Sequence, residues 1–328
     1  MAKIRIAILG ASEIAYRRFL PALIKDQRFE YVGVAYEREQ DAEKVLDFKA
    51  NYGGHIFTSF NDVFNDPSVD AVYVPQPPAF HFSFGKRVLE SGKHLFMEKP
   101  FTIDLKDTQT LINIAKDKKL GVVENYMFRF HKQIKAFQDL VLNEDLIGKV
   151  KKYEVRFSFP RRATTDFRYN KKLGGGALFD CGGYTIMLSD ILLARKGQIT
   201  AFRPIYSDEF EVDIGGEGLF ENKGLKCEFS FGMDNPYFCY AKAYGEKGIL
   251  IANRVLTAPS DFDVNFDILD SLGNIIRQIN IGIDDSFLKS IDNFYKAVSE
   301  NEIRKENYEI ITRQAEMIEK VKALGGIK

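Results

Sequence analysis

The 328-residue sequence contains only three cysteines and no tryptophan. Cys181, Cys227 and Cys239 form no C-x-x-C pair, so their spacing predicts neither a zinc site nor a dithiol redox motif, and we expect no metal. A sparse and odd number of cysteines is typical of reduced thiols in the cytoplasm. The start of the chain, MAKIRIAILG, also lacks the pattern of a secretory signal peptide. We therefore expect a cytoplasmic protein.

The sequence also lacks an excess charge and a long apolar run. Lys and Arg together number 46, as do Asp and Glu, which argues against nucleic acid or an anionic membrane as a partner. No apolar run approaches the roughly 20 residues that span a bilayer. Hydrophobic residues make up 45% of the chain and charged residues 28%, as in ordinary globular proteins. At this length two domains are expected.

The first third of the chain alternates short apolar runs with segments of helical periodicity. IRIAILG (Ile4–Gly10) is nearly continuous in apolar residues, as is typical of a parallel strand buried on both faces. Similar short apolar runs occur in YVGVAY, DAVYVPQP, KHLFME and LGVVEN. Segments with helical periodicity lie between them. Repeated units of this kind predict a doubly wound parallel sheet of the Rossmann type.

Beyond about Val150 the pattern changes. Segments such as KVKKYEVRFSF, EVDIGGEGLF and FCYAKAYG are rich in β-branched and aromatic residues and are separated by Gly or Asn-Pro. They predict a large, mostly antiparallel open sheet with one covered face. We thus expect an α/β protein with a Rossmann domain in residues 1–123 and a second α/β domain in residues 124–328. The last helices of the chain can also pack back on the first domain.

GASEIA, at the turn from the first strand to the first helix, resembles the dinucleotide fingerprint G-x-G-x-x-G/A. Gly10 suits the tight turn, Ser12 stands at the second glycine position, and Ala15 suits close packing of the helix on the sheet. Amide groups at a helix start attract phosphates, and the predicted cofactor contacts here are Gly10, Ala11, Ser12, Glu13 and Ile14. The alternative is an ordinary tight turn.

Cofactor choice is expected to depend on AYEREQ, after the second strand. Glu37 occupies the place where an acid binds the ribose hydroxyls and favours NAD, whereas Arg38 could stack on adenine or bind a 2′-phosphate and favours NADP. Because the carboxylate comes first after the strand, we expect NAD. The alternative for both residues is a pair of exposed loop charges.

Two further segments contain candidate catalytic residues. Lys99, in EKP, follows a strand whose carboxyl end should face the ligand, and Glu98 beside it is placed to orient it. LGGGALFDCGGY opens with three glycines and places Asp180 and Tyr184 four residues apart, on one face of a helix. The alternatives are an exposed lysine and a tyrosine buried in the core.

Over essentially the whole chain, the sequence resembles the Gfo/Idh/MocA oxidoreductases. The resemblance rests on five segments that occur in the same order: GASEIA, VYVPQPPAFH, EKP, ENYMFRFH and LGGGALFDCGGY. The resemblance implies that Lys99 is catalytic, beside the nicotinamide, and that the Lys99–Pro100 bond is cis. Many members have a histidine where this chain has Tyr184. Tyrosine stands there in glucose–fructose oxidoreductase, dimeric dihydrodiol dehydrogenases and nucleotide-sugar 3-ketoreductases. The resemblance to these members implies that Tyr184 is the proton donor. Ser12 departs from the usual glycine.

The resemblance also implies further binding residues. Those expected to contact the cofactor, besides the turn and the loop after the second strand, are Pro75, Pro77, His81, Glu98 and Lys99. Those expected to bind substrate are Arg129, His131, Arg168 and Asp180. Taken by their sequence alone, Arg129, His131 and His81 would more often be structural. Many members of the family assemble through the open sheet, so a homodimer or homotetramer is expected.

The expected function is transfer of a hydride between NAD or NADP and a carbohydrate. IAYRRFLPAL looks most like the 3-ketoreductases that build deoxysugars, so we expect reduction of a nucleotide-linked keto-sugar. The first alternative is a sugar or trans-dihydrodiol dehydrogenase. A non-catalytic dinucleotide-binding regulator is disfavoured by the presence of Lys99, and a glycosidase with bound NAD by the absence of histidine at position 184.

Overall fold

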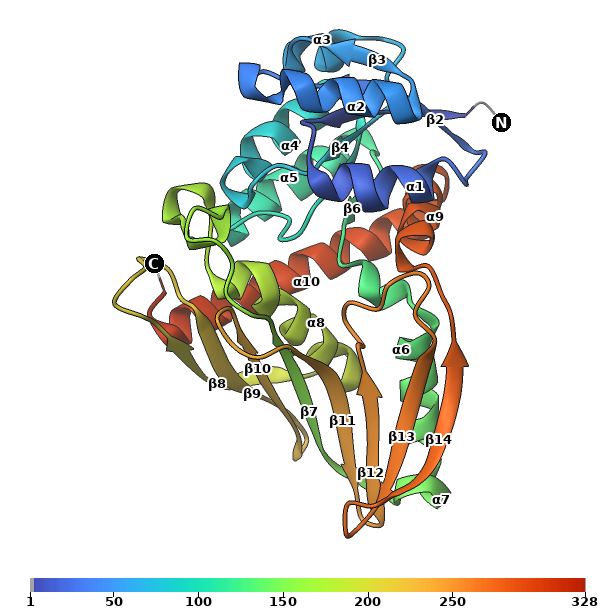
Figure 1. The fold of residues 1–328 in the computed structure, drawn as a ribbon, viewed down its shortest axis with the longest axis vertical. Helices are drawn as coiled ribbons and strands as arrows, with labels where there is room; N and C mark the ends of the chain where they lie inside the picture. Colours follow the sequence, from blue (N-terminus) through green and yellow to red (C-terminus); the bar gives the residue numbers. More distant parts are fainter. Residues whose placement is uncertain (1–2, 328) are drawn as a thin grey trace. The chain divides into compact units, whose positions relative to one another are not determined.

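A computed structural model describes residues 3–327 of the chain. The chain forms two compact units. The first, called unit 1, comprises Met1–Tyr126 and Phe287–Ala315; the second, unit 2, comprises Met127–Ser286 and Glu316–Lys328. The chain therefore returns to unit 1 after it has built most of unit 2 (Figure 1). No helix among the described residues is both long and apolar enough to cross a membrane.

Unit 1 is built around a parallel sheet of six strands in the order β3-β2-β1-β4-β5-β6. The strands are β1 (Ile4–Leu9), β2 (Phe29–Ala35), β3 (His55–Phe57), β4 (Ala71–Val74), β5 (His94–Met97) and β6 (Val122–Glu124). The strand order reverses direction between β1 and β4, where ligands of doubly wound sheets bind. The prediction of a doubly wound parallel sheet is confirmed.

Helices cover both faces of this sheet, and its strands are apolar because neither face meets water. Val72, Val74, Leu95 and Met97 are completely buried in the resulting core. The helical segments are η1 (Ala15–Phe19), α1 (Leu20–Leu23), η2 (Glu39–Asp41), α2 (Ala42–Tyr52), α3 (Phe60–Asn65), η3 (Pro78–Phe80), α4 (His81–Glu90), α5 (Leu105–Lys118), α9 (Ser286–Ser299) and α10 (Asn301–Gly325), whose residues from Glu316 on belong to unit 2.

Unit 2 contains an eight-stranded sheet in the order β14-β13-β12-β11-β7-β10-β9-β8. All neighbouring pairs are antiparallel except β7 and β10. The strands are β7 (Val150–Ser158), β8 (Gln198–Ile205), β9 (Gly215–Asn222), β10 (Leu225–Gly232), β11 (Phe238–Gly245), β12 (Gly248–Asn253), β13 (Val264–Asp270) and β14 (Ile275–Gly282). The predicted large, mostly antiparallel sheet is confirmed.

Helices cover one face of this sheet. Its helical segments are η4 (Met127–Phe130), α6 (Lys132–Val141), α7 (Glu144–Ile147), η5 (Phe167–Tyr169), η6 (Lys171–Leu173), η7 (Leu178–Gly182) and α8 (Gly183–Leu192). Helix α8 packs on β7 and β10. Along β7, Tyr153, Val155 and Phe157 are buried toward this side, whereas Glu154 and Arg156 alternate with them and are only partly buried. Glu154 and Arg156 lie on the opposite face of the sheet, which we call the outer face.

Candidate active site

The turn after β1 is held in a conformation that requires glycine at position 10. Gly10 has a φ of +99°, which L side chains rarely adopt. Its N–H donates to the carbonyl of Ala35 at 2.8 Å, and a Cβ here would lie 2.1 Å from Nε2 of Gln76. Gln76 in turn donates to the carbonyl of Leu9 at 2.5 Å. Glycine is therefore required at position 10, and Gln76, which the sequence did not single out, holds the turn.

Ser12 serves as a helix cap in the place of the usual glycine. Its hydroxyl accepts a hydrogen bond from the N–H of Ala15 at 3.2 Å, and its own N–H donates to the carbonyl of Gly10 at 2.9 Å. Ala11, Ser12 and Ile14 are partly exposed and Glu13 is exposed. The serine thus orders the start of the helix and keeps the turn accessible. This backbone fits the phosphates of a dinucleotide.

Glu37 and Arg38 are both exposed, and both make contacts within unit 1. A carboxylate oxygen of Glu37 accepts from the N–H of Phe60, at the start of α3, at 3.3 Å. Nε of Arg38 donates to Asp41 at 2.8 Å, and the Lys44 ammonium lies 3.2 Å from the same carboxylate. The loop after β2 and the start of α2 therefore place Arg38 and Lys44, both paired with Asp41, close to Glu37 in the sequence, where the adenosine ribose is expected.

His81 is completely buried behind the turn that contains Pro75 and Pro77. Its Nδ1 lies 2.6 Å from the carbonyl of Pro100 and its Nε2 lies 2.6 Å from the carbonyl of Gln76. Burial lowers the pKa of His81 to about 4, so the ring is neutral and donates its one N–H to one of these carbonyls. His81 thus joins the turn after β4 to the segment after β5 from inside, while residues 75–77 are partly exposed.

Lys99 lies just beyond β5, and its bond to Pro100 is cis, as the family resemblance implied. Next to it, Glu98 accepts hydrogen bonds from the Tyr73 hydroxyl and the Asn125 amide, both at 2.7 Å. Burial raises the pKa of Glu98, although these hydrogen bonds and the Lys99 ammonium favour its carboxylate. The side chain of Glu98 is therefore held in one orientation beside Lys99.

The segment that contains Lys99 is braced from two further elements. The hydroxyl of Ser290, on α9, donates to Oδ1 of Asn125 at 2.9 Å. The N–H of Phe101 donates to the carboxylate of Glu124, at the end of β6, at 2.7 Å. Sequence reasoning missed Tyr73, Asn125 and Ser290. The dipeptide Glu124–Asn125, two polar residues directly after a buried strand, was the available signal.

In unit 2 the glycine run before η7 packs tightly on its surroundings. A Cβ at Gly175 would lie 2.5 Å from the carbonyl oxygen of Arg168, and one at Gly176 would lie 2.5 Å from Oδ1 of Asp213. Asp213 is buried and accepts from the N–H of Leu178 at 2.7 Å. Burial raises the pKa of Asp213 to about 7. This carboxyl, which caps the helical segment η7–α8, was not found from the sequence.

Tyr184 lies in the first turn of α8 and is 7% exposed. Its ring packs between Phe128 and the edge-on ring of Phe157, with centroids 5.7 and 5.5 Å away. Its hydroxyl donates to the sulfur of Met127 at 3.8 Å. Apolar walls thus hold the ring, and the Met127 sulfur is a weak acceptor for the hydroxyl.

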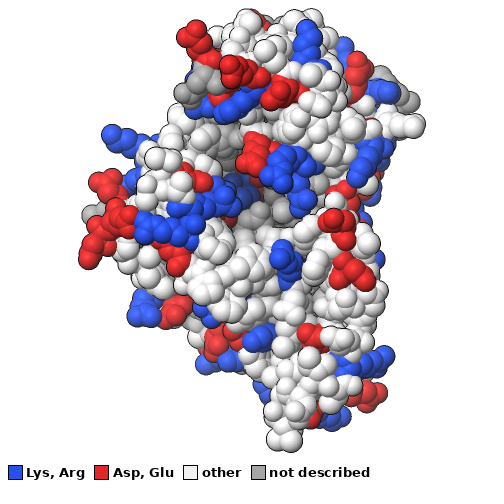
Figure 2. Space-filling model, viewed as in Figure 1, with Lys and Arg blue, Asp and Glu red and all other residues white. Residues whose placement is uncertain are grey.

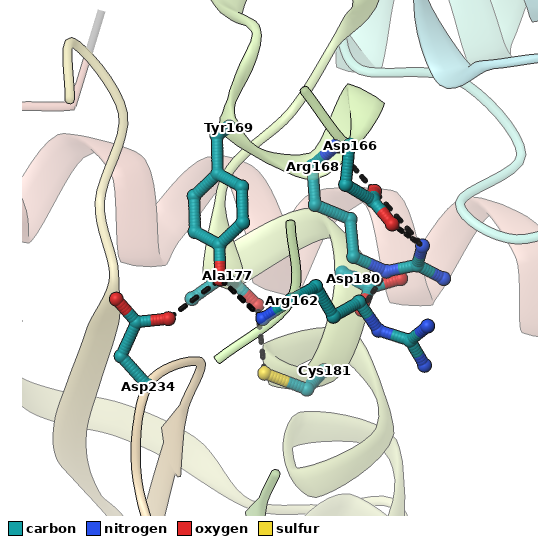
Figure 3. Close-up of polar contacts among 8 residues, drawn as sticks. All are labelled: Arg162, Asp166, Arg168, Tyr169, Ala177, Asp180, Cys181 and Asp234. Carbon is teal, nitrogen blue, oxygen red and sulfur yellow. Dashed lines mark hydrogen bonds and ion pairs between the residues drawn. The ribbon is translucent and has the colours of Figure 1, made fainter. Parts of the chain in front are cut away.

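Arg168 lies between two carboxylates. Its Nε donates to Asp180 at 2.7 Å, and its Nη1 lies 3.1 Å from Asp166 (Figure 3). Burial opposes the charge of Arg168, but the two carboxylates raise its pKa above the ordinary value. The structure therefore brings together Arg168 and Asp180, both predicted to bind substrate, one helical turn before Tyr184.

Arg129 and His131 lie on the segment that begins unit 2. The Arg129 guanidinium lies over the ring of Phe130, 4.2 Å from its centroid. Nδ1 of His131 accepts from the N–H of Gln133 at 3.2 Å and caps α6, and the side chain is buried. His131 therefore shapes the backbone next to Arg129.

The cysteines are buried and form no disulfide. Burial raises the pKa of Cys227 to about 12 and also that of Cys239. Among residues 3–327, no three or more His, Cys, Asp or Glu side chains gather in a way that could hold a metal ion.

Comparison with protein families gives a match in both units. Residues 4–126 match the family described as "Oxidoreductase family, NAD-binding Rossmann fold". Residues 138–251 match the family described as "GFO/IDH/MocA C-terminal domain".

Individual relatives cover nearly the whole chain. A dTDP-3,4-didehydro-2,6-dideoxy-alpha-D-glucose 3-reductase of Actinomadura kijaniata is 31% identical over 97% of this chain and 95% of its own. A D-xylose 1-dehydrogenase (NADP(+)) of Haloferax volcanii is 26% identical over 90% of this chain and 89% of its own. The crystal structure of a 3-ketoreductase from Actinomadura kijaniata with NADP and TDP-benzene has a TM-score of 0.92 at 31% identity, covering 98% of both chains.

Proposed function

Because this chain belongs to the Gfo/Idh/MocA family of oxidoreductases, we propose that it is an NADPH-dependent reductase of a nucleotide-linked keto-sugar. The observation that carries the proposal is Lys99, positioned at the carboxyl end of β5 with Glu98 and Asn125 beside it. The full-length similarity to a dTDP-sugar 3-reductase supports the choice of substrate class.

A nicotinamide cofactor would supply the hydride. The residues of this chain that would hold it are those of the turn after β1, the loop after β2 and the turn after β4: Gly10, Ala11, Ser12, Glu13, Ile14, Glu37, Arg38, Pro75 and Pro77. Gly10 permits close approach of the backbone, and Ser12 orders the helix start beneath the phosphates. His81 and Glu98 act behind these segments, because their hydrogen bonds fix the turns on which the contact residues lie.

Reduction of a ketone places negative charge on its oxygen and requires a proton. We assign charge stabilisation to the Lys99 ammonium, since a fixed positive charge lowers the energy of a developing alkoxide. We assign proton donation to the Tyr184 hydroxyl, whose ring is held by Phe128 and Phe157. Hydrogen bonds to the sugar are assigned to Asp180 and Arg129. Arg168 keeps Asp180 oriented, and His131 orders the segment of Arg129.

The preference for NADP reverses the expectation of NAD drawn from the position of Glu37. Relatives of this chain are named for NADP(+) or have been crystallised with NADP. Glu37 already accepts a backbone N–H from α3, and Arg38 and Lys44 supply two cations beside it. These cations suit a 2′-phosphate, which pairs with Arg through two parallel hydrogen bonds.

Assembly into a homodimer or homotetramer through the outer face of the eight-stranded sheet is also proposed. On this face Glu154 of β7 accepts hydrogen bonds from Tyr240 and Tyr244 of the neighbouring strand β11, both at 2.6 Å, so the two aromatic side chains are held in place. Aromatic residues that are held in place are common in such interfaces. Cytoplasmic location is proposed because the three cysteines form no disulfide.

The test is a panel of nucleotide-linked keto-sugars and free sugars, assayed with NADPH and NADH by nicotinamide absorbance. We expect reduction of a nucleotide-linked keto-sugar, faster with NADPH. Oxidation of free sugars without reduction of any nucleotide sugar would favour a sugar dehydrogenase, the second candidate, which the similarity to a D-xylose dehydrogenase supports. Binding of NADPH without turnover of either class would indicate a regulator.

A further inference from the structure

A basic segment precedes the helix of Tyr184. From Pro160 to Lys172 the sequence is PRRATTDFRYNKK, with five basic residues and one acid, in a chain whose formal net charge is zero. It connects β7 to the glycine run before η7. Basic side chains gather over this part of unit 2, near the loops before α8 (Figure 2). The local excess of positive charge is therefore not a reflection of overall composition.

Two of the five cations are already neutralised. Arg168 pairs with Asp166 and Asp180, and Arg161 pairs with Glu209 and lies 3.8 Å from Asp234. The remaining three, Arg162, Lys171 and Lys172, are exposed, and no carboxylate among the described residues forms an ion pair with them. These three side chains are available to an anion.

The backbone of Arg162 is held at a defined position, and its guanidinium lies 5.4 Å from the centroid of the Phe159 ring. Its backbone N–H donates to the hydroxyl of Tyr169 at 3.2 Å, and that hydroxyl donates to Asp234 at 2.5 Å. Tyr169 is 6% exposed and stacks on Phe210, with centroids 4.3 Å apart. Figure 3 shows Tyr169 between Asp234 and Arg162, with the Arg162 side chain extending on the same side of the tyrosine as Arg168.

The basic segment is also joined directly to the helix of Tyr184. The N–H of Gly176 donates to the carbonyl of Arg168 at 2.8 Å, and the N–H of Gly175 donates to the carbonyl of Asn170 at 3.0 Å. Arg168 then reaches Asp180, one turn before Tyr184. The backbone that carries Arg162 is thus fixed relative to the proposed proton donor, because both belong to one hydrogen-bonded part of unit 2.

We propose that Arg162, with Lys171 and Lys172, binds the diphosphate of the nucleotide-linked substrate. This inference rests on the proposed function. A diphosphate next to the sugar is the group that distinguishes such a substrate from a free sugar, and an arginine recognises it through paired, charge-assisted hydrogen bonds. The two lysines add positive potential around the same segment. Specificity for nucleotide-linked sugars is thus assigned to residues 162–172, and the chemistry to Lys99 and Tyr184.

The experiment measures binding of dTDP by isothermal titration calorimetry, and KM and kcat for a reducible nucleotide sugar. Arg162→Gln should weaken dTDP binding and raise KM by roughly tenfold, as loss of a charge-assisted hydrogen bond predicts, with kcat changed much less. Arg162→Lys should recover part of the affinity, because the charge remains but the paired donors do not. Lys171→Gln with Lys172→Gln should lower affinity at low salt and have less effect at high salt.

Arg161→Gln is the matched control, since this neighbouring arginine is exposed and already paired with Glu209. It should bind dTDP like the wild type. If wild type binds dTDP and Arg162→Gln binds it equally, with circular dichroism showing both folded, the diphosphate assignment is overturned while the proposed function stands. If wild type neither binds dTDP nor reduces any nucleotide sugar, the proposed function itself fails.

Discussion

At the scale of single residues, the two proposed catalytic groups are held in different ways. Lys99 is next to a polar network in which Glu98 accepts from Tyr73 and Asn125. Tyr184 is held instead by two aromatic rings and a methionine sulfur. Hydrogen bonds therefore position the residues beside the Lys99 ammonium, whereas packing positions the Tyr184 ring. Substitution of Lys99 removes a charge, and substitution of Tyr184 by Phe removes only a hydroxyl.

Lys99→Met should leave cofactor affinity nearly unchanged and reduce kcat by about 10²–10³-fold, because the charge opposite the developing alkoxide is lost. Steady-state kinetics on a chemistry-limited substrate, with NADPH titrated by fluorescence, gives both quantities. Lys106→Met, on the exposed side of α5, is the control and should retain wild-type kinetics. More than about a tenth of wild-type kcat in Lys99→Met would refute the role.

Tyr184→Phe keeps the ring between Phe128 and Phe157 and removes only the hydroxyl. If the hydroxyl donates the proton, kcat should fall by roughly 10²–10⁴-fold, while thermal stability stays near that of the wild type because the ring keeps its aromatic contacts. The pH dependence of kcat should also lose the limb that belongs to the tyrosine. An unchanged rate and profile would make Tyr184 a core residue.

At the scale of elements, the start of the η7–α8 segment depends on Asp213. Its carboxylate accepts from Leu178 while its backbone carbonyl accepts from Ala177 at 2.9 Å. Gly176 leaves the space that this carboxylate occupies. One buried residue thus positions the helix that presents Asp180 and Tyr184, which makes the orientation of that helix sensitive to the state of a single carboxyl.

Asp213→Asn should change how stability depends on pH. The folded pKa, about 7, lies above the ordinary 3.8, so between about pH 4 and pH 7 the folded protein keeps a proton that the unfolded chain loses. Wild-type stability therefore falls as pH rises through this window, by up to about 1.4 kcal/mol per pH unit from this group. The variant keeps an acceptor for the N–H of Leu178 but has no titrating group at position 213. Its free energy of unfolding relative to that of the wild type should therefore increase as the pH rises toward 7.

The measurement is the free energy of unfolding in urea from pH 4.5 to 7.5 for both proteins. Asp208→Asn, at an exposed loop position, is the control and should track the wild type across the range. A difference between wild type and Asp213→Asn that stays constant with pH would show that Asp213 has an ordinary pKa in the folded protein.

At the scale of the whole molecule, the outer face of the large sheet is the proposed assembly surface. Ile251 on β12 pairs in register with Lys242 on β11 and Asp267 on β13, so it lies on the same face as these polar side chains. Ile251→Glu places a carboxylate beside Asp267 in an interface that should bury it. We expect a shift to monomer in light scattering. Leu142→Glu, at the 78% exposed end of α6, should leave the assembly unchanged.

An assembly that is unaffected by Ile251→Glu would place the contact elsewhere. A wild-type protein that is monomeric at all concentrations would remove the proposed assembly and leave the reaction mechanism intact, because Lys99 and Tyr184 belong to the same chain.

The sequence by itself determined the features that depend on residues close together in the chain, namely the strands, the helices and the short turns. Alternating apolar runs and helical periodicity predicted both sheets, since strand and helix periods are properties of short segments. The turn at Gly10 was predicted from the spacing of the fingerprint, and the cis bond between Lys99 and Pro100 from the family resemblance; both depend on residues within a few positions of one another. The family resemblance rested on such short segments in order, and family comparison confirmed it.

Only the tertiary structure decided the hydrogen bonds and the strand pairing between residues far apart in the chain. Asp213 caps a helical segment 35 residues earlier, and Ser290 reaches Asn125 across 165 residues. Asp and Ser are common surface residues, so nothing in their local sequence marks them as buried partners. The parallel pairing of β7 with β10 was likewise set by the sheet as a whole. Long-range packing selects such partners, because a buried polar group must find a hydrogen bond wherever the fold supplies one.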